Sequence, residues 1–350
     1  MSKRLVNILL LVLLAFAINS CERRPLADIT ERVSVRVLIK TKTILNVTTG
    51  IYNERIPLPD VSPKTIRVIF YDPDTKSIRT QGFISRKGVD SEGNEYIEGE
   101  VNVRPGTYDI LCYNFDTPTT MVTGENNKNT IMAYTSEISE YLYTRFRSRA
   151  DDNTEEALEP RIYYEPDHLL VASKEQTHIP EHTEVITIEA DANTIVDSYY
   201  IQVRLKNGRY ASDASAVLTD LAPATNFGID QRKDDEYAAT FFEMHRSTDP
   251  RIRTDNQEVL CAVFNTFGKR SDDVDPSIES KLYVTFNVIT TEGKSVEMTV
   301  NMDSIFQTED AKQRHWLLID KVFEIPEPSG SGFKPVVGGW DDENGIINLK

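Results

Sequence analysis

Apolar and polar side chains alternate over short stretches along most of this chain, and no other feature restricts its fold as strongly. Residues 34–40 and 65–70 show the period of two that a strand with one buried and one exposed face produces. Turn-forming residues at 72–74 and 104–106 then reverse the chain. Short strands separated by turns at this spacing predict an all-β fold made of antiparallel sandwiches.

The alternation continues through two series of strands. The expected strands are 34–40, 65–70, 82–84, 95–103, 107–115, 184–189, 198–205, 216–219, 237–242, 259–264, 281–289, 295–300 and 316–325. Between the series, apolar spacing over 134–149 predicts a short helix, and the acidic stretch 151–159 predicts an exposed loop. A chain of 350 residues is long enough for two domains. We therefore expect tandem β-sandwich domains at 28–172 and 180–325, with a helix and loop inserted.

The first 21 residues have the parts of an export signal that ends at a cysteine. Lys3 and Arg4 supply positive charge, residues 5–18 are apolar, and a small residue precedes Cys21. At a rise of 1.5 Å per residue the apolar stretch covers about 21 Å, which is shorter than the ~30 Å hydrocarbon core of a bilayer. We therefore expect residues 1–20 to be a signal peptide that is removed.

The chain carries a strong negative charge. It has 39 basic and 55 acidic residues, a formal net charge of -16, and loss of Lys3 and Arg4 with the signal leaves 37 against 55, or -18. Such a surface repels nucleic acid and anionic lipid headgroups. We therefore expect no nucleic-acid partner. The ending at residues 18–21 resembles the lipobox of bacterial lipoproteins, which implies a lipid on Cys21. This lipid, rather than surface charge, is expected to hold the protein at the membrane.

No arrangement of residues in the sequence predicts catalysis or a bound metal. His178 and His182 have the i, i+4 spacing of a helical metal site, but Pro180 between them would break the helix. The stretch 90–95 has its glycine at the fourth position instead of the sixth position of a calcium loop, which favours an ordinary turn. We expect a protein that is not an enzyme and needs no cofactor.

Two cysteines are left once Cys21 is modified. Cys112 and Cys261 both lie inside apolar, strand-like segments. A buried thiol that acts as a small apolar side chain is the simpler interpretation. A disulfide is permitted in an exported protein, but it would have to join the middle of one strand to the middle of another.

The composition changes after residue 325. Residues 326–332 form a linker rich in proline, glycine and serine, and an apolar tail follows up to residue 350. The tail is too apolar to be exposed to water, so it either folds back as a last strand of the second sandwich or enters the groove of a partner subunit. The residues that would make these contacts are Phe333, Val336, Val337, Trp340, Ile346, Ile347 and Leu349.

Several short motifs in a fixed order carry a resemblance to a known family. They are the start at 21–26, the stretches 105–108, 113–115, 167–172, 264–268 and 315–319, and the glycine-rich linker that leads to Phe333 and Trp340. In this combination the mature chain resembles the fimbrillin-type lipoproteins of Bacteroidales. The resemblance implies two transthyretin-like sandwiches, a lipid on Cys21, and a non-enzymatic role as an anchor or accessory subunit that meets other fimbrial subunits through β-strands.

A surface lipoprotein that binds glycans is the alternative, because tandem sandwiches on lipid tethers also serve this purpose. Glycan sites usually present exposed aromatic side chains, whereas most aromatic residues here fall inside strands. We expect an outer-membrane location. Glu22 is followed by Arg23 and Arg24 instead of the acidic run of many surface-directed relatives, so the sequence does not choose between the outer and the periplasmic face.

Overall fold

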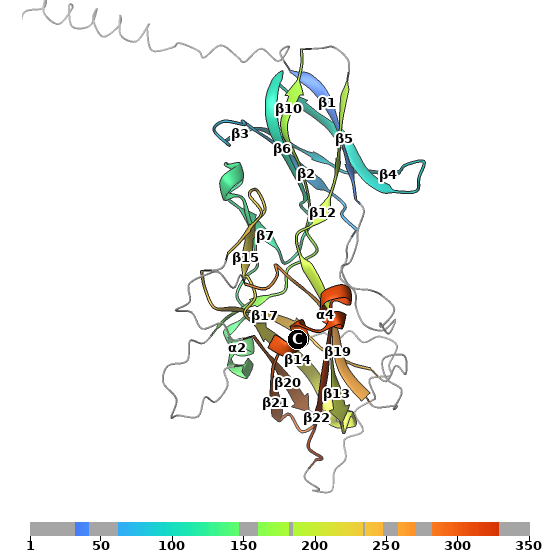
Figure 1. The fold of residues 1–350 in the computed structure, drawn as a ribbon, viewed down its shortest axis with the longest axis vertical. Coiled ribbons are helices and arrows are strands. Elements are labelled where there is room, and N and C mark those ends of the chain that lie inside the picture. Colours follow the sequence, from blue (N-terminus) through green and yellow to red (C-terminus); the bar gives the residue numbers. More distant parts are fainter. Residues whose placement is uncertain are drawn as a thin grey trace, which may run out of the picture.

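The structure is a computed structural model that describes residues 32–41, 62–146, 160–181, 185–233, 235–247, 258–270 and 282–328. These residues form an elongated molecule in which two β-sandwiches follow one another along the long axis (Figure 1). The expected all-β fold class is confirmed. Most neighbouring strands in the described ranges are antiparallel, as expected, but three pairs among them are parallel: β1 with β11, β13 with β22, and β9 with β17.

The N-terminal sandwich packs a four-stranded sheet, in the order β11-β1-β5-β4, against a five-stranded sheet, in the order β12-β10-β6-β2-β3. Its strands are β1 (Val33–Lys40), β2 (Ile66–Tyr71), β3 (Ile78–Ile84), β4 (Arg86–Val89), β5 (Glu95–Val103), β6 (Gly106–Asn114), β10 (Leu170–Ile179), β11 (Ile186–Asp191) and β12 (Asn193–Thr194). The predicted alternation accounts for the core, in which Val35, Val37 and Ile39 of one sheet share a cluster with Ile66 and Phe70 of the other.

The C-terminal sandwich packs a sheet in the order β18-β19-β13-β22 against one in the order β21-β20-β14-β17-β9. Its strands are β9 (Arg161–Tyr164), β13 (Asp197–Lys206), β14 (Ala211–Thr219), β17 (Ala238–Glu243), β18 (His245–Ser247), β19 (Glu258–Thr266), β20 (Tyr283–Thr290), β21 (Ser295–Asn301) and β22 (Trp316–Glu324). Phe242 and Phe264 stack in its core with ring centroids 4.0 Å apart. Two short helices, α3 (Asp303–Phe306) and α4 (Glu309–Arg314), connect β21 to β22.

A small third sheet, in the order β16-β15-β8-β7, covers part of the N-terminal sandwich. Its strands are β7 (Met121–Thr123), β8 (Met132–Tyr134), β15 (Ala224–Asn226) and β16 (Gln231–Arg232), and the remaining short helices are η3 (Lys128–Thr130), α2 (Glu140–Phe146) and η4 (Gly208–Tyr210). Ala133 and Phe227 of this region pack with Ile69 and Leu111 on the outer face of the five-stranded sheet. The third sheet therefore joins segments from both halves of the chain.

The two sandwiches have the same topology. In chain order, β1, β2, β3, β4, β5, β6, β10 and β11 correspond to β13, β14, β17, β18, β19, β20, β21 and β22. In both, the first strand lies between the last strand, which is parallel to it, and an antiparallel neighbour. The added strands differ, because β12 extends the N-terminal sandwich beside β10 and β9 extends the C-terminal one beside β17. The chain therefore contains a structural repeat.

The boundary between the sandwiches differs from the expected ranges 28–172 and 180–325. β11 and β12 pair with β1 and β10, so the N-terminal sandwich continues to residue 194. β9 crosses in the other direction, since it precedes β10 in the chain but pairs with β17. The helix expected within 134–149 is present as α2, and it packs on the C-terminal sandwich. Pairing between distant segments sets the boundary, and a local change of composition does not report such pairing.

Candidate functional site

The residues predicted to make functional contacts lie outside the described part of the chain. These residues are Cys21 at the expected lipid site, and Phe333, Val336, Val337, Trp340, Ile346, Ile347 and Leu349 in the tail. The lipid on Cys21 and the contacts of the tail therefore stay predictions. The last described residue is Pro328, which follows β22 at the end of the molecule opposite to β1 (Figure 1).

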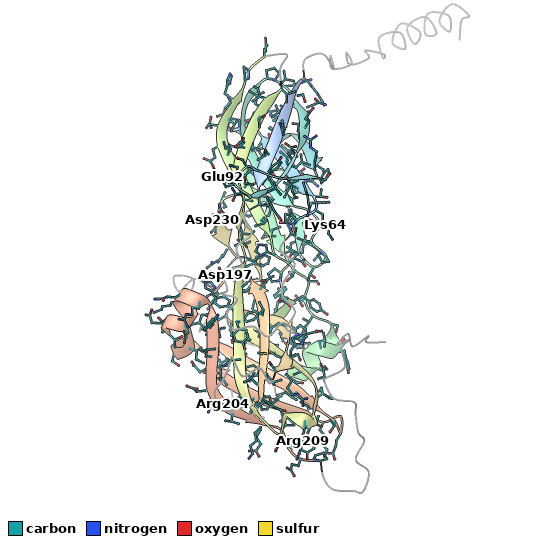
Figure 2. All side chains as sticks on the ribbon, turned by 90° about the vertical axis from the view of Figure 1, so that its right-hand side faces the viewer. Lys64, Glu92, Asp197, Arg204, Arg209 and Asp230 are labelled. Atoms are coloured by element: carbon teal, nitrogen blue, oxygen red, sulfur yellow. The ribbon has the colours of Figure 1, made fainter. Side chains whose placement is uncertain are left out.

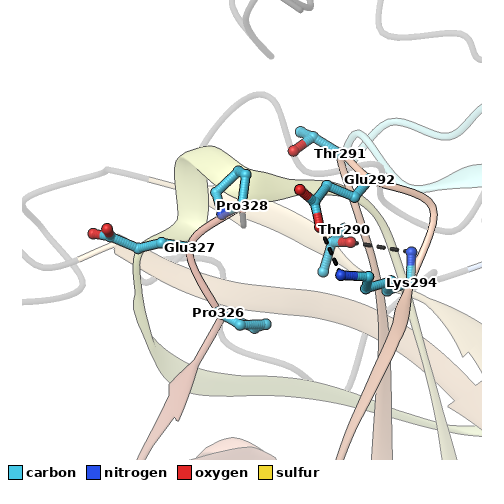
Figure 3. Close-up of a pocket in the computed structure, with 7 residues that line it drawn as sticks. All are labelled: Thr290, Thr291, Glu292, Lys294, Pro326, Glu327 and Pro328. Atoms are coloured by element: carbon cyan, nitrogen blue, oxygen red, sulfur yellow. Dashed lines mark hydrogen bonds and ion pairs between the residues drawn. The ribbon is translucent and has the colours of Figure 1, made fainter. Parts of the chain in front are cut away.

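A shallow pocket lies where the described chain ends. Its lining comes from the turn between β20 and β21 and from the segment after β22, and consists of Thr290, Thr291, Glu292, Lys294, Pro326, Glu327 and Pro328 (Figure 3). Lys294 Nζ lies 2.8 Å from the carboxylate of Glu292, and the Lys294 backbone N–H donates to Thr290 Oγ1 at 3.1 Å. These bonds hold the turn together beside the point where the predicted linker begins.

The motif at 167–172 lies at the junction of the two sandwiches, in the segment that leads from β9 to β10. Asn114, at the end of β6, accepts the Leu170 backbone N–H through its Oδ1 atom at 2.7 Å. The Asp167 carboxylate accepts the backbone N–H of Thr120 at 2.6 Å, and Thr120 Oγ1 accepts the Asp167 N–H at 2.7 Å. The N-terminal sandwich therefore fixes one end of this crossing segment.

Asn265, from the motif at 264–268, fixes the other end of the crossing segment to the C-terminal sandwich. Its Nδ2 atom donates to the Pro166 carbonyl oxygen at 3.0 Å, and its backbone N–H donates to Glu165 Oε2 at 3.0 Å. Its own Oδ1 accepts a bond from the Ser198 hydroxyl at 2.7 Å. Residues from three motifs that are far apart in the sequence thus lie close together here. Their hydrogen bonds connect the two sandwiches.

Two titratable groups in the crossing segment have altered pKa values. Burial raises the pKa of Glu165 to about 7, with further contributions from the nearby carboxylates of Glu243 and Asp167. Burial also lowers the pKa of His168 to about 4. His168 is therefore neutral at pH 7, whereas Glu165 titrates near that pH.

An exposed aromatic pair stands on the outer face of the N-terminal five-stranded sheet. The side chains of Phe83 and Phe115 are 51% and 48% exposed, and their ring centroids lie 5.2 Å apart at an interplanar angle of 59°. The guanidinium carbon of Arg67 lies 5.4 Å and 5.2 Å from the two centroids. The two rings are tilted against each other and both contact the same Arg67 guanidinium. They therefore do not form the flat platform that a sugar ring would need.

The open edge of β3 adjoins this aromatic pair. Among the described strands β3 is paired with β2 alone, and its first residue, Ile78, donates its backbone N–H to the carbonyl oxygen of Asn126 at 3.0 Å on the other side; the counterpart β17 lies between β14 and β9. Phe241 on β17 is 7% exposed because Phe146 and Tyr164 pack on its ring, while Phe83 on β3 is open to solvent. An unpaired edge beside an apolar face is a surface that can accept another strand.

His178, one of the two histidines considered as metal ligands, lies on a strand. His178 lies on β10, where Thr107 Oγ1 is 3.4 Å from its Nδ1 atom, so it is not part of a helix, and His182 lies outside the described residues. Within the described ranges, no group of three or more His, Cys, Asp or Glu side chains could hold a metal ion. The Asp90 carboxylate accepts hydrogen bonds from the backbone N–H groups of Glu92 and Asn94. These bonds close the turn that the sequence predicted at 90–95.

The two internal cysteines lie in described strands, one in each sandwich. Cys112 and Cys261 are buried and form no disulfide, as the simpler interpretation predicted. No helix in the part of the chain that the structure describes is long and apolar enough to cross a bilayer.

The repeated sandwich is a known fold. A crystal structure of a protein provisionally assigned as an adhesin, from Bacteroides ovatus, matches with a TM-score of 0.54 and 18% identity, over 89% of this chain and 99% of that one. The likeness shows that the two chains share a fold. The fimbrial anchor protein Mfa2 from Porphyromonas gingivalis gives a TM-score of 0.45 and 10% identity, over 84% of this chain and 90% of that one.

The comparison of sequences is more specific. A family model described as "Domain of unknown function (DUF5119)" matches residues 53–243, more than half of the chain, so the chain belongs to this family. A protein of Bacteroides ovatus, provisionally named fimbrium anchoring subunit Fim4B, is 22% identical over 317 residues, which are 82% of this chain and 85% of that protein. These matches confirm the resemblance drawn from the sequence motifs.

Proposed function

We propose that this chain is a non-enzymatic subunit of the cell envelope that anchors a fimbrium or supports its assembly. The observation that carries the proposal is the match to a fimbrium anchoring subunit over most of the length of both chains. The shared sandwich fold and the open edge of β3 support a role in association between proteins. The fimbrial partner subunits are the partners that this proposal requires.

We further propose that a lipid on Cys21 holds the protein in the outer membrane. The apolar stretch 5–18 and the small residue before Cys21 support an exported lipoprotein. The negative charge of the chain gives it no attraction of its own to an anionic membrane surface. The lipid therefore has to supply the membrane affinity, and two or more acyl chains are needed for stable attachment.

Replacing the lipid-bearing residue tests this proposal. The Cys21→Ser variant should lose incorporation of a labelled fatty acid and should appear in the soluble fraction after a carbonate wash. Cys112→Ala is a suitable control, since it also removes a thiol but leaves the signal intact. A Cys21→Ser protein that still sediments with washed membranes would contradict the lipid anchor.

Deletion of the tail tests the proposed association with fimbrial subunits. If the tail from Phe333 to Leu349 enters a partner subunit, truncation after Pro326 should abolish association and leave the melting temperature of the isolated protein nearly unchanged. The two quantities can be measured by co-purification with the fimbrial subunits and by thermal unfolding. A truncated protein that melts much earlier and still assembles would show that the tail packs on its own domain.

A further inference from the structure

We infer that each sandwich is a mechanical clamp, whose first and last strands are placed side by side so that a pull along the molecule shears them against one another. The use of such a clamp rests on the proposed function, because an anchor subunit is loaded between its membrane tether and the fimbrium. The described strands form both ladders within a single chain, without any partner.

The first clamp is formed by the ladder between β1 and β11. Residues 35–40 of β1 run parallel to residues 186–191 of β11, and the whole of β1 also pairs with β5 on its other side. The chain enters β1 from the side of the proposed anchor and leaves β11 toward the C-terminal sandwich. Because the strands are parallel, the entry and the exit lie at opposite ends of the ladder. Tension between them therefore acts along the strands.

The second clamp repeats this arrangement with β13 and β22. These strands are parallel over 200–206 and 316–324, with a bulge in β22 between Ile319 and Val322. Figure 2 shows Asp197, at the start of β13, near the middle of the molecule and Arg209, just beyond its end, near the tip. The ladder thus lies along the long axis, and the chain leaves β22 at the tip. A pull between the two ends of the molecule is again directed along the strands.

Side-chain bonds strengthen the second ladder at the end where the load arrives. Asn207 Nδ2 donates to the carbonyl oxygen of Ile325 at 3.2 Å, and Lys206 Nζ lies 2.8 Å from the carboxylate of Glu324. The Arg204 guanidinium also donates to the carbonyl oxygen of Asp320, which lies in the bulge. The exposed edge strand β22 is therefore tied to β13 by side chains in addition to its backbone.

The direction of the load decides how these bonds resist it. A strand that is peeled from one end loses its hydrogen bonds one after another, and because each bond is weak by itself, the strand separates under a small force. When the same strand is sheared, all bonds of the ladder are loaded together and must fail nearly at once. Forced unfolding depends on the height of the unfolding barrier, and shearing raises that barrier without any change in equilibrium stability.

The two clamps share the same surroundings. In each, the first strand (β1 or β13) has a neighbour on both sides, and the last strand (β11 or β22) is paired, within the described residues, with that first strand alone. We therefore expect both sandwiches to resist an end-to-end pull in the same way.

Single-molecule force spectroscopy on the full mature chain tests the inference by changing the pulling direction alone. In this experiment the force is applied between two attachment points, or handles, at chosen positions. A pull between handles at positions 22 and 327 shears the second ladder. Handles at positions 209 and 327 unzip it, because the Arg209 and Glu327 side chains face each other at 3.8 Å across the open end of the ladder. Handles at 32 and 185 likewise unzip the first ladder, since Val35 is in register with Ile186.

The expected result is a first rupture force that is severalfold lower with handles at 209 and 327 than with handles at 22 and 327. The pair at 32 and 185 should also rupture at a lower force than the end-to-end pull. Equal forces in all directions would overturn the inference. Such a result would leave the proposed fimbrial role intact. If instead the rupture force depends on the pulling direction but the protein does not bind fimbrial subunits, the proposed function is contradicted and the inference about the strands still holds.

Discussion

At the level of single residues, buried charges occur where a loop or a crossing segment meets a sheet. Asp109 on β6 is completely buried, and its carboxylate lies 2.7 Å from Lys76 Nζ and 3.8 Å from Lys128 Nζ. The backbone N–H of Gln176, in a bulge of β10, donates to the same carboxylate at 3.0 Å. Asp109 thus fastens the η3 region and the bulge to the sheet.

Neutralising this carboxylate should therefore destabilise the protein. Asp109→Asn leaves the buried Lys128 ammonium with less compensation, and we expect a loss of about 3 kcal/mol or more in the free energy of unfolding. Urea denaturation measures this loss. The exposed residue Asp74 provides the control, since Asp74→Asn should change the midpoint very little. Equal midpoints for the two variants would show that Asp109 is not a structural charge.

Glu165 gives a second prediction at this scale. Its pKa is about 7 in the folded protein and near 4.5 when unfolded, so the folded state holds a proton that the unfolded state has lost between these values. Glu165 therefore reduces stability as the pH rises through this range. Glu165→Gln should stabilise the protein at pH 8, by up to about 3 kcal/mol, and have almost no effect at pH 4.

Denaturation of both proteins at several pH values measures this difference. The pKa of His168 is lowered to about 4, so its burial acts in the opposite direction and reduces stability as the pH falls below about 6.5. His168 is present in both proteins, and its contribution cancels in the comparison. A gain from Glu165→Gln that is the same at pH 4 and pH 8 would contradict the assignment.

At the level of elements, the sequence predicted the strands whose side chains alternate and missed those that do not. β1 and β5 have a regular period, whereas in β10 the residues 174–176 are all exposed and Gln176 has a φ of 49° at the bulge. β9 has four residues and follows an acidic stretch. The alternation of apolar and polar residues does not show whether a strand pairs in parallel or which strand it pairs with. Neither the structural repeat nor the parallel pairing of the end strands could therefore be predicted from the sequence.

The corrected boundary changes which fragments should fold. The fragment 28–172 lacks β11 and most of β10, so one flank of β1 and one of β6 stay unpaired. We expect it to show no cooperative unfolding. The fragment 28–196 contains both strands, and with residues 136–165 replaced by a short linker it should unfold cooperatively in urea, as followed by circular dichroism. Cooperative unfolding of 28–172 would restore the boundary expected from the sequence.

At the level of the whole molecule, the candidate site was only partly accessible to sequence analysis. The motifs at 113–115, 167–172 and 264–268 were noticed in order, but nothing in the sequence indicated that Asn114 and Asn265 fix the same segment. Asn114 bonds to residues 54 and 56 positions away, and Asn265 to residues 99 and 100 positions away. The sandwiches are therefore coupled by a crossing segment, in addition to the third sheet that both halves of the chain share.

Loss of this connection should separate the unfolding of the two sandwiches. Asn265→Ala removes the side-chain bonds to Pro166 and Ser198. We expect one thermal transition for the natural chain and two for the variant, which differential scanning calorimetry would resolve. Asn129, which is exposed, serves as the control position. A single transition in Asn265→Ala would show that the third sheet alone couples the sandwiches.

The two buried thiols have a practical consequence. Cys112 lies on β6 in one sandwich and Cys261 on β19 in the other, and burial raises the pKa of Cys112 to about 12. A buried thiol reacts with an alkylating reagent only after its surroundings have opened, because the reactive thiolate has to form in water. The rate at which each cysteine is alkylated therefore reports how often its own sandwich opens. The natural chain thus has one internal probe of opening in each sandwich.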